Sequence, residues 1–420
     1  MDNPPGSALS RFMAREFDIV IAGAGLNGCT MALVLANTGF AVALVDAQPF
    51  DVLGDAGFDG RGYAIALASQ RMLNVLGIWP RLSGKTTPML NIKISDGRLH
   101  DGPGPHVLEF DHAEIEEGPM GHMVEDRALR PVLIEQCVNH PDITVFAPNI
   151  VASVTQSDAS CEVKLNGGIS LSAALVIGCD GYRSARAEEA GIKRAFCDYG
   201  QTALVCAVDH ERPHHGIAHQ YFLPAGPLAI LPLPGNRSSI VWAEATANAQ
   251  RIAGLDDPKF LAELRLRFGD FLGALSLAGA RFTYPLVLSV AKKMVASRLA
   301  LVGDAAHKLH PIAGQGLNAG LRDVATLGEV LTRARRRGED IGAADVLERY
   351  QRWRAFDIKT LSLATDGFNK LFSNDNSWLR AGRDLGLDIV AASPALRRGF
   401  IREAAGLTGE LPNLLQGRAI

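Results

Sequence analysis

The 420-residue sequence predicts an α/β fold that contains an inserted β-rich region and ends in a helical region. Three observations support this prediction. A glycine-rich turn near the N-terminus lies between two short apolar runs, and a second glycine-rich stretch follows an apolar run near residue 300. Residues 191–282, between them, have the pattern of short strands. A chain of this length is expected to form more than one domain.

The composition is that of an ordinary globular protein. Hydrophobic residues make up 47% of the chain, charged residues 21%, and the formal net charge is −3. This balance gives no electrostatic basis for binding nucleic acid, so none is expected as a partner. The six cysteines include no CxxC pair, which favours free thiols in a reducing cytoplasm. No apolar run is as long as a membrane span, and residues 1–16 lack the apolar core of a signal peptide.

The first expected unit is a βαβ segment near the N-terminus. The apolar run Phe17–Ala22 is predicted to be a strand, and it leads into Gly23-Ala24-Gly25-Leu26-Asn27-Gly28. An apolar helix follows and ends near Gly39, and a second strand, residues 41–45, ends at Asp46. A GxGxxG sequence between two strands, with an acid after the second strand, indicates a Rossmann-type dinucleotide site.

Each residue of this fingerprint has a physical role. Gly23 makes the tight turn, Gly25 lets the backbone approach a pyrophosphate, and Gly28 allows close packing of the helix. Asp46 can accept hydrogen bonds from the adenosine ribose, and its charge repels a 2′-phosphate. The expected dinucleotide is therefore FAD or NAD and not NADP. The alternative is a glycine-rich turn with no ligand.

Several short elements are expected next. Residues 72–79 have the spacing of an amphipathic helix that ends near Gly77. Residues 91–96 and 107–110 alternate as half-buried strands do, and they are expected to belong to the substrate domain. Four short runs within residues 143–171 are expected to form a small antiparallel layer. Arg61, in a glycine-rich loop, is a candidate phosphate ligand because a guanidinium suits a phosphate; the alternative is an exposed loop arginine.

A second glycine-rich stretch, residues 303–323, follows another apolar run. Asp304 lies at the carboxyl end of that expected strand, where open α/β sheets bind ligands, and it can accept hydrogen bonds from a polyol. Pro311 stiffens the turn, and Gly314 and Gly316 let backbone N–H groups approach a flat ring. The helix that follows directs its positive end to the same place, which favours a ligand that becomes anionic on reduction.

A third candidate motif, Asp180-Gly181, follows a buried apolar run. Together the three stretches resemble the motifs of the FAD-dependent aromatic hydroxylases with the para-hydroxybenzoate hydroxylase fold. Residues 303–323 are most similar to the ubiquinone-biosynthesis branch of that family. The resemblance implies that Asp180-Gly181 contacts both FAD and NAD(P)H, and that Arg61 and Arg127 lie near the FAD pyrophosphate. For Arg127 the alternative is an ion pair with Glu125 or Asp126.

The chain departs from the family pattern at one position. Family members commonly have an arginine seven residues after the aspartate of this motif, where this chain has Ala187. Arg183 or Arg186 could substitute for it, and both alternatives stay open at this point. His307 and His310 lie close to the acid of the second motif, but no third ligand follows at a suitable spacing, so no metal is expected.

The expected FAD site comprises Gly23, Ala24, Gly25, Leu26, Asn27, Gly28, Asp46, Arg61, Arg127, Asp180, Gly181, Gly303, Asp304, Pro311, Gly314, Gly316, Leu317 and Asn318. In the family the flavin carries out the chemistry, so no catalytic acid or base is assigned. Pro311 and Gly314 are expected to lie near the flavin ring.

The β-rich region is expected to bind the substrate. Its apolar, proline-punctuated run 221–233 suits a pocket for a greasy aromatic ring. The candidate pocket residues are Tyr199, Gln201, Phe222, Leu223, Ile230 and Trp242. The alternative for each of them is a place in the core of a twisted sheet.

The expected boundaries follow from these assignments. The predicted segments are 15–90, 105–190 and 285–340 for the FAD-binding domain, 91–104 and 191–284 for the substrate domain, and 341–420 for the C-terminal helical region.

The resemblance implies a FAD-dependent monooxygenase that hydroxylates the ring of a polyprenylated phenol in ubiquinone biosynthesis. It implies NADH or NADPH as a transient reductant and O2 as the oxidant. Such an enzyme is expected in the cytoplasm, in a soluble biosynthetic assembly or in peripheral contact with the inner face of the membrane. The alternatives are a hydroxylase of a small soluble aromatic compound and a dinucleotide-binding protein without turnover.

Overall fold

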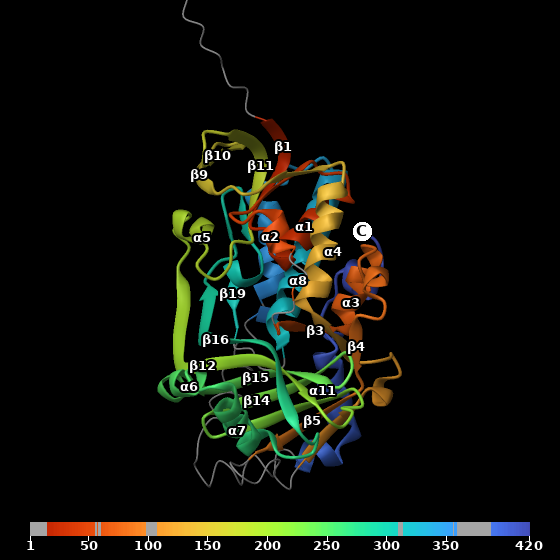
Figure 1. Cartoon of the computed structure of the whole chain (residues 1–420). Helices are drawn as coiled ribbons and strands as arrows, with labels where there is room; N and C mark the ends of the chain where they lie inside the picture. The colour runs from red at the N-terminus through yellow and green to blue at the C-terminus, as the bar shows by residue number, and fades with distance from the viewer. Residues whose placement is uncertain are drawn as a thin grey trace, which may run out of the picture.

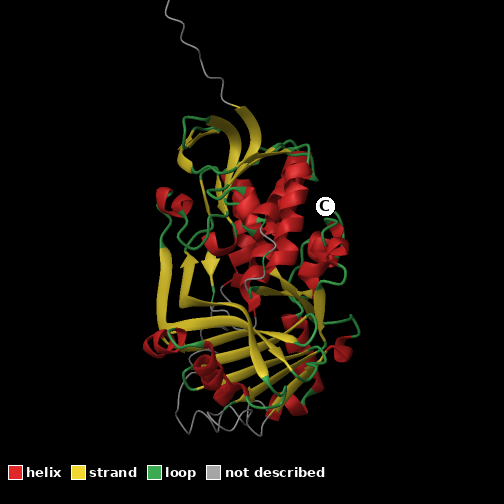
Figure 2. Ribbon diagram, viewed as in Figure 1, coloured by secondary structure: helices red, strands yellow, loops and turns green. Residues whose placement is uncertain are grey.

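The computed structural model describes residues 15–54, 57, 60–97, 107–309, 314–355, 357–358 and 388–420. The chain forms two layers (Figure 1). Helices crowd around the sheet of the first layer, whereas the second layer is mainly a broad sheet with short helices beneath it (Figure 2). No helix of the described residues is both long and apolar enough to cross a membrane.

The first sheet has the strand order β17-β18-β11-β1-β2-β8. Its strands are β1 (Arg15–Ala22), β2 (Val42–Val45), β8 (Ile143–Phe146), β11 (Ser170–Gly178), β17 (Val295–Ala296) and β18 (Leu299–Leu301). The core strands from β18 to β8 run parallel, and Ile19, Val20 and Ile21 of the central strand are fully buried. Burial on both faces explains why these strands are continuous apolar runs.

The structure corrects part of the expected antiparallel layer. Only β9 (Val151–Gln156) and β10 (Cys161–Leu165) form an antiparallel pair, which continues onto β11. β8 instead extends the parallel sheet, and residues 170–171 begin the long strand β11. A short apolar run does not specify its partner strand, which is why the sequence misplaced β8.

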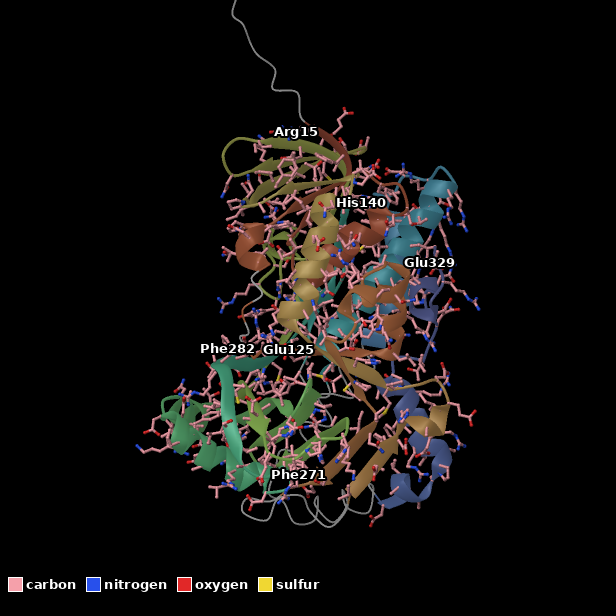
Figure 3. The ribbon with its side chains drawn as sticks, turned by 45° about the vertical axis from the view of Figure 1, so that its right-hand side comes forward. Arg15, Glu125, His140, Phe271, Phe282 and Glu329 are labelled. Carbon is pink, nitrogen blue, oxygen red and sulfur yellow. The ribbon has the colours of Figure 1, made fainter. Side chains whose placement is uncertain are left out.

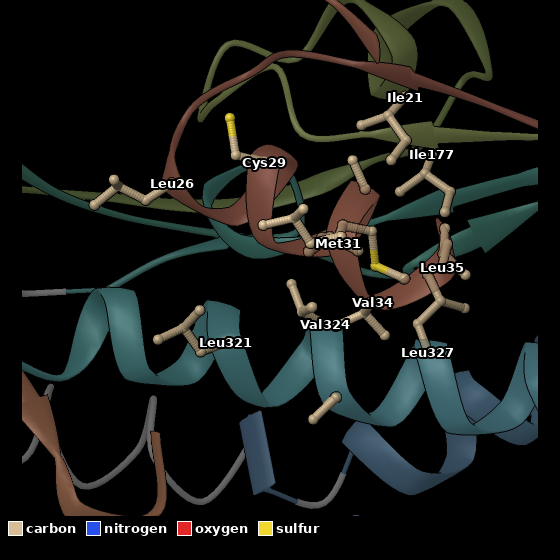
Figure 4. Packing of buried hydrophobic residues seen from close by; sticks show 14 of the residues in the cluster. Ile21, Leu26, Cys29, Met31, Val34, Leu35, Ile177, Leu321, Val324 and Leu327 are labelled. Carbon is tan, nitrogen blue, oxygen red and sulfur yellow. The ribbon is translucent and has the colours of Figure 1, made fainter. Parts of the chain in front are cut away.

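Helices pack together against this sheet. They include α1 (Leu26–Ala36), α4 (Asp126–Asn139) and α8 (Gln315–Arg336). Side chains of α1 interdigitate with those of α8 (Figure 4). The two helices lie close together at Gly328. A Cβ added to this residue would lie 2.4 Å from the Cγ1 atom of Val34, so glycine permits the close approach. This packing fixes the second glycine-rich motif against the first.

A three-stranded sheet joins the layers, in the order β3 (Gly62–Ala66), β7 (Gly121–Glu125) and β4 (Thr86–Met89). Helix α3 (Leu67–Val75) follows β3 directly, and residues 79–82 form a separate 3-10 turn after Gly77, whose φ is +72°. The helix expected over residues 72–79 therefore begins earlier than the sequence predicted, and it ends just before Gly77, near the expected end. A left-handed glycine ends it.

The second sheet has the order β19-β16-β12-β15-β14-β13-β5-β6. Its strands are β5 (Asn91–Asp96), β6 (Val107–Asp111), β12 (Arg194–His210), β13 (Ile217–Leu223), β14 (Gly226–Leu233), β15 (Arg237–Ala245), β16 (Leu275–Ala291) and β19 (His307–Lys308). β12 and β16 are each 17 residues long and extend as a two-stranded ribbon toward the first layer (Figure 1).

The pairing in this sheet crosses two expected domain boundaries. β6 pairs with β5, so residues 107–111 lie in the second sheet and not in the first domain. β16 runs through the expected boundary at residue 285 without a break. The alternation of residues 107–110 was the signal in the sequence for the first correction. Composition changes little along a continuous strand, so the sequence had no signal for the second.

The two faces of the second sheet have different neighbours. One face is covered by α6 (Thr246–Ala253) and α7 (Asp257–Phe268), with a fully buried core that includes Trp242 and Phe260. The other face meets the three-stranded sheet, where Ala207 and Leu233 pack with Ala64. Alternate residues of each strand point to opposite faces, as strand geometry requires.

The remaining described elements are short or C-terminal. They are α2 (Phe50–Leu53), α5 (Ala185–Glu189), α11 (Pro394–Ala404), and 3-10 turns at His112–Ile115, Gly303–Ala305 and Asn413–Gln416. Residues 344–355 are helical, as expected for the C-terminal region 341–420. Much of the rest of that region lies outside the described residues.

Candidate functional site

The glycine-rich turn after β1 requires glycine at two positions for steric reasons. Gly23 has a φ of +104°, and a Cβ there would lie 2.4 Å from the Cys179 carbonyl oxygen. A Cβ on Gly28 would lie 1.9 Å from the carbonyl oxygen of Gly23. A Cβ on Gly25 would meet nothing within 4 Å, so this residue faces open space.

The open space lies at the N-terminus of α1. Gly25 is the N-cap of this helix and makes no side-chain capping bond. The first N–H groups of an α-helix have no partner within the helix, and together with the helix dipole they attract an anion. This geometry suits a pyrophosphate, as the fingerprint predicted.

Asp46 lies at the end of β2, over the same turn. One of its carboxylate oxygens accepts a hydrogen bond from the Ala24 N–H at 2.6 Å, and the other accepts from the Gln48 N–H at 2.8 Å. The carboxylate is therefore fixed in direction while its remaining lone pairs can still accept hydrogen bonds from ribose hydroxyls.

Two buried oxygens at this place have no hydrogen-bond partner among the described residues. They are the Oδ1 atoms of Asn27 and Asp180. Buried polar atoms are nearly always hydrogen-bonded in folded proteins, so two orphans beside an open glycine-rich turn indicate a missing polar ligand. A dinucleotide provides hydroxyl groups that can satisfy both oxygens, and the residues present therefore fit FAD.

Asn27 also joins the two glycine-rich motifs in space. A Cβ added to Gly303 or to Gly320 would lie 2.3 Å from the Asn27 Nδ2 atom. The side chain thus fills the gap between the turn after β18 and the first part of α8. The motifs at residues 23–28 and 303–320, far apart in sequence, form one site.

Asp304 follows Gly303, whose φ is +64°, in the turn after β18. Its side chain is reachable by solvent, yet surrounding protein raises the pKa of the Asp304 carboxyl; His307, Lys308 and Arg194 limit this rise. Because its surroundings disfavour the charged form, hydrogen bonds from a ligand's hydroxyl groups would stabilise the ionised carboxylate.

The N-terminus of α8 faces the same recess. Gly314, the N-cap, has a φ of +65° and no side-chain capping bond, and a Cβ on Gly316 would meet nothing within 4 Å. Asn318 bonds instead to the backbone of β3: its Oδ1 atom accepts from the Ala66 N–H at 2.9 Å and its Nδ2 atom donates to the Ala64 carbonyl at 2.8 Å. Its side chain therefore anchors the helix.

Pro311, expected beside the ring, and His310 lie outside the described residues. No group of three or more possible metal ligands occurs in the described part of the chain.

The expected phosphate ligands Arg61 and Arg127 each have a protein partner. Arg127 donates to Glu125 at 2.6 Å, the alternative foreseen from the sequence, and Arg61 lies 3.3 Å from Asp126. Both arginine side chains keep more than a third of their surface exposed. Figure 3 labels Glu125 where the first layer meets the second sheet.

Each candidate substitute for the arginine missing at Ala187 has its guanidinium group on a protein partner. The buried Arg186 guanidinium donates to the Val151 carbonyl at 3.0 Å and pairs with Glu189, while the Arg186 backbone N–H donates to the Asp180 carboxylate at 3.2 Å. Arg183 is exposed and lies over the Tyr182 ring, 5.3 Å from its centroid.

Arg194, the first residue of β12, contacts the turn that carries Asp304, and the sequence did not predict this contact. It donates to the Ser289 hydroxyl at 2.7 Å and to the Asp304 carbonyl at 3.3 Å. Burial lowers the pKa of Arg194, and the carboxylates of Asp304 and Asp180 oppose this shift. No motif marks Arg194 in the sequence, because only the fold returns β12 to the first layer.

The structure divides the expected pocket residues between two faces of the second sheet. Leu223, Ile230 and Trp242 lie in the core against α6 and α7, so the prediction that they line a pocket is wrong. Alternation along the strands puts Gln201 and Phe222 on the opposite face, and Tyr199 packs there against a small cluster of Ala203, Ala243 and Leu286. That cluster belongs to neither main core.

Fold and site together define a class of protein: an α/β dinucleotide-binding protein in which a β-sheet domain lies against the cofactor recess. Comparisons with known proteins agree with this class. A family model described as "FAD binding domain" matches residues 16–359.

Two curated relatives match nearly the whole chain. Ubiquinone hydroxylase UbiL of Rhodospirillum rubrum is 44% identical over 95% of this chain and 92% of its own length. The 3-demethoxyubiquinol 3-hydroxylase of Escherichia coli is 35% identical over 93% of this chain and 98% of its own length.

A solved structure, p-nitrophenol 4-monooxygenase PnpA from Pseudomonas putida DLL-E4, superposes with a TM-score of 0.77 at 18% identity, covering 94% of this chain and 99% of that one. This likeness shows the fold. The chain belongs to the FAD-dependent hydroxylase family of ubiquinone biosynthesis. The predicted family, fold class, FAD cofactor and enzyme class are thereby confirmed.

Proposed function

We propose that this protein hydroxylates the aromatic ring of a polyprenylated phenol in ubiquinone biosynthesis, with bound FAD, NADH or NADPH as a transient reductant, and O2. The observation that carries this proposal is the 44% identity to Ubiquinone hydroxylase UbiL over 95% of the chain. The apolar floor of the second sheet, formed by Ala203, Ala243 and Leu286, is the structural feature that suits such a substrate.

The residues of the first layer would hold the cofactor by the dipole of a helix and by hydrogen bonds. The N-terminus of α1 would meet the pyrophosphate, Asp46 the adenosine ribose, and Asp304 the ribityl chain. Reduced flavin, when bound, supplies the electrons that activate O2. The N-terminus of α8 at Gly314 would favour the negative charge that reduction places on the ring. We assign Pro311 to the neighbourhood of the same ring.

The second sheet would hold the substrate ring over the cofactor. Ala203 and Ala243 are direct partners across β12 and β15, and they form a small buried apolar cluster on this face. Leu286, Val205 and Val241 surround them with apolar surface. Such a floor excludes water and orients the ring by contact, without an acid or base.

The reductant would bind transiently over the flavin, because the sequence contains no second GxGxxG that would hold a resident NADH or NADPH. We assign the protein to the cytoplasm, in peripheral contact with the inner face of the membrane where the prenylated substrate resides.

Helix α11 suits that contact. Its Leu396 and Phe400 side chains are exposed by 46% and 41%, beside the exposed Arg398. The basic end of α8 suits it less, since Arg333 and Arg335 pair with Glu329 and Asp18.

The test supplies NADH or NADPH, detergent and a polyprenylated phenol to the purified FAD-loaded protein. Reductant oxidation should accelerate with the phenol, and isotopically labelled O2 should place one oxygen atom in the product. Equal efficiency with a phenol lacking the prenyl tail would instead assign the protein to small soluble aromatic compounds. Absence of any reduction of the bound flavin would leave a dinucleotide-binding protein without turnover.

A further inference from the structure

The buried carboxylate of Asp323, on α8, is the centre of a network beneath the turn that carries Asp304. It accepts hydrogen bonds from the Gly303 N–H at 2.9 Å and from the His307 Nε2 atom at 2.6 Å. Its other oxygen accepts from the Arg354 Nε atom at 2.6 Å. Asp323, His307 and Arg354 are each at most 2% exposed.

Burial would raise the pKa of the Asp323 carboxyl, but His307 and Arg354 together hold it below its usual value. Asp323 is therefore ionised in the fold. An ionised carboxylate with all its lone pairs free for N–H donors can bind Gly303, His307 and Arg354 at once, whereas a protonated one loses acceptor capacity.

Arg354 reaches this network from outside the three motifs. It lies in the helical residues 344–355, and Tyr350, one turn earlier, donates from its hydroxyl to the Leu301 carbonyl at 2.8 Å. Arg354 also donates to Asp357 at 2.7 Å. One helix of the C-terminal region thus holds both the end of β18 and the carboxylate under the turn.

The turn has little freedom to move once Gly303 is held. Its N–H is bonded to Asp323, and there is no room on its other side because a Cβ would lie 2.3 Å from the Asn27 Nδ2 atom. The next residue is Asp304, so the position of Asp304 depends on the direction of the Asp323 carboxylate.

We propose that Arg354 is a positioning residue of the FAD site, which acts through Asp323 to fix the turn that presents Asp304. The C-terminal helical region is then part of the cofactor site, although it touches no cofactor. The proposal rests on the FAD site of the proposed function and is independent of the substrate assigned there.

The test compares the FAD dissociation constants of the Arg354→Met and Arg349→Met variants, measured by flavin-fluorescence titration of the apoprotein. Arg349 is a matched control because it is on the same helix and pairs with Glu339 and Asp345 at the surface. Removal of a buried charged hydrogen bond should raise the constant for Arg354→Met at least about tenfold. The constant for Arg349→Met should stay within about twofold of the wild-type value, because exposed ion pairs contribute little.

Amide hydrogen exchange of the same apoproteins separates positioning from general loss of stability. Residues 299–309 should exchange faster in Arg354→Met, while the strands β14 and β15 keep wild-type protection. An unchanged dissociation constant, or an equal rise of exchange throughout the chain, would overturn the proposal.

Arg354→Lys provides the answer if Arg354→Met does not fold. Lysine keeps the charge but not the planar, two-directional donors that join Asp323 to Asp357. The proposal requires weaker FAD binding by Arg354→Lys as well. Wild-type binding by that variant would show that position 354 serves only the fold. Because every readout is cofactor binding or exchange, a failure of the prenylated substrate would leave this result intact.

Discussion

The two sheets of this protein contribute to the site in different ways. The parallel sheet contributes its strand ends: β1, β2, β11 and β18 each end one or two residues before a residue of the expected FAD site. The second sheet contributes one of its faces, on which Ala203 and Ala243 lie side by side. A strand end is encoded by consecutive residues, whereas a face is encoded by every second residue. Motifs therefore reveal the first kind of site and conceal the second.

The largest expected effect tests the strand-end site. Gly28→Ala should yield protein without FAD, or no folded protein, because the new Cβ would lie 1.9 Å from the Gly23 carbonyl oxygen, which cannot move aside. Gly25→Ala should fold normally and bind FAD more weakly, since its Cβ enters open space where the pyrophosphate would lie. Flavin content and thermal melting measure both. A Gly28→Ala protein that binds FAD as well as wild type would contradict the steric argument.

A second prediction concerns the helix-side face of the second sheet. Trp242→Ala should destabilise the protein by about 3–5 kcal/mol, because the indole is fully buried against Phe260 and truncation leaves a cavity. Denaturant unfolding measures the change. FAD affinity, determined below the unfolding transition, should be unchanged; a large loss of affinity at wild-type stability would place Trp242 in the site after all.

Asp304→Ala tests the acid at the end of β18. A hydrogen bond to a charged group contributes about 1.5–3 kcal/mol, so FAD affinity should fall roughly ten- to hundredfold. Asp270→Ala is the control, because Asp270 is an exposed acid of the second layer that pairs with Arg265. Equal affinities for Asp304→Ala and Asp270→Ala would remove Asp304 from the site.

Ala243→Leu tests the other face of the second sheet. A larger side chain would occupy space assigned to the substrate ring, so kcat/KM for the prenylated phenol should fall by about tenfold or more, equivalent to about 1.4 kcal/mol. FAD affinity should be unaffected, since the residue belongs to the substrate floor. If activity is retained while FAD binding is lost, the assignment of this face to the substrate is wrong.

The smallest effect is a pH dependence. The pKa of Asp304 is raised in the free protein because surrounding atoms disfavour its charge. Ionised Asp304 accepts hydrogen bonds better, so FAD affinity should be constant at high pH and fall as the pH falls through that raised pKa. Asp304→Asn should give a flat profile over the same range. A fall of equal size in Asp304→Asn would assign the dependence to another group.

The sequence predicted the parallel sheet and its motifs because their local signals are strong. The turn at Gly23, the acid at Asp46 and the turn at Gly303 occupy the expected places. The prediction of pocket residues from the sequence failed on the second sheet. Leu223 and Phe222 are neighbours in sequence there but face opposite sides of the sheet. Hydrophobicity alone does not say which face of a two-sided sheet meets a ligand.

Two arginines were missed for a different reason. Arg194 contacts Asp304 because β12 extends toward the first layer. Arg354 contacts Asp323 from a helix that follows the last motif in sequence. Both contacts join residues far apart in sequence, and neither residue lies in a pattern with a fixed spacing. Arg183 and Arg186 are nearer in sequence, but the Arg186 guanidinium bonds to the Val151 carbonyl and Arg183 lies over the Tyr182 ring.

The Asn27 side chain fills the gap between Gly303 and Gly320, and this contact has a consequence for biosynthesis of the protein. During translation the first βαβ unit emerges long before β18 and α8 exist, so a nascent chain exposes only half of the cofactor site. Cofactor capture must then be a late event that follows synthesis of almost the whole chain. Chains released early would remain without flavin, and the yellow colour of the finished protein would report that translation ran past residue 320.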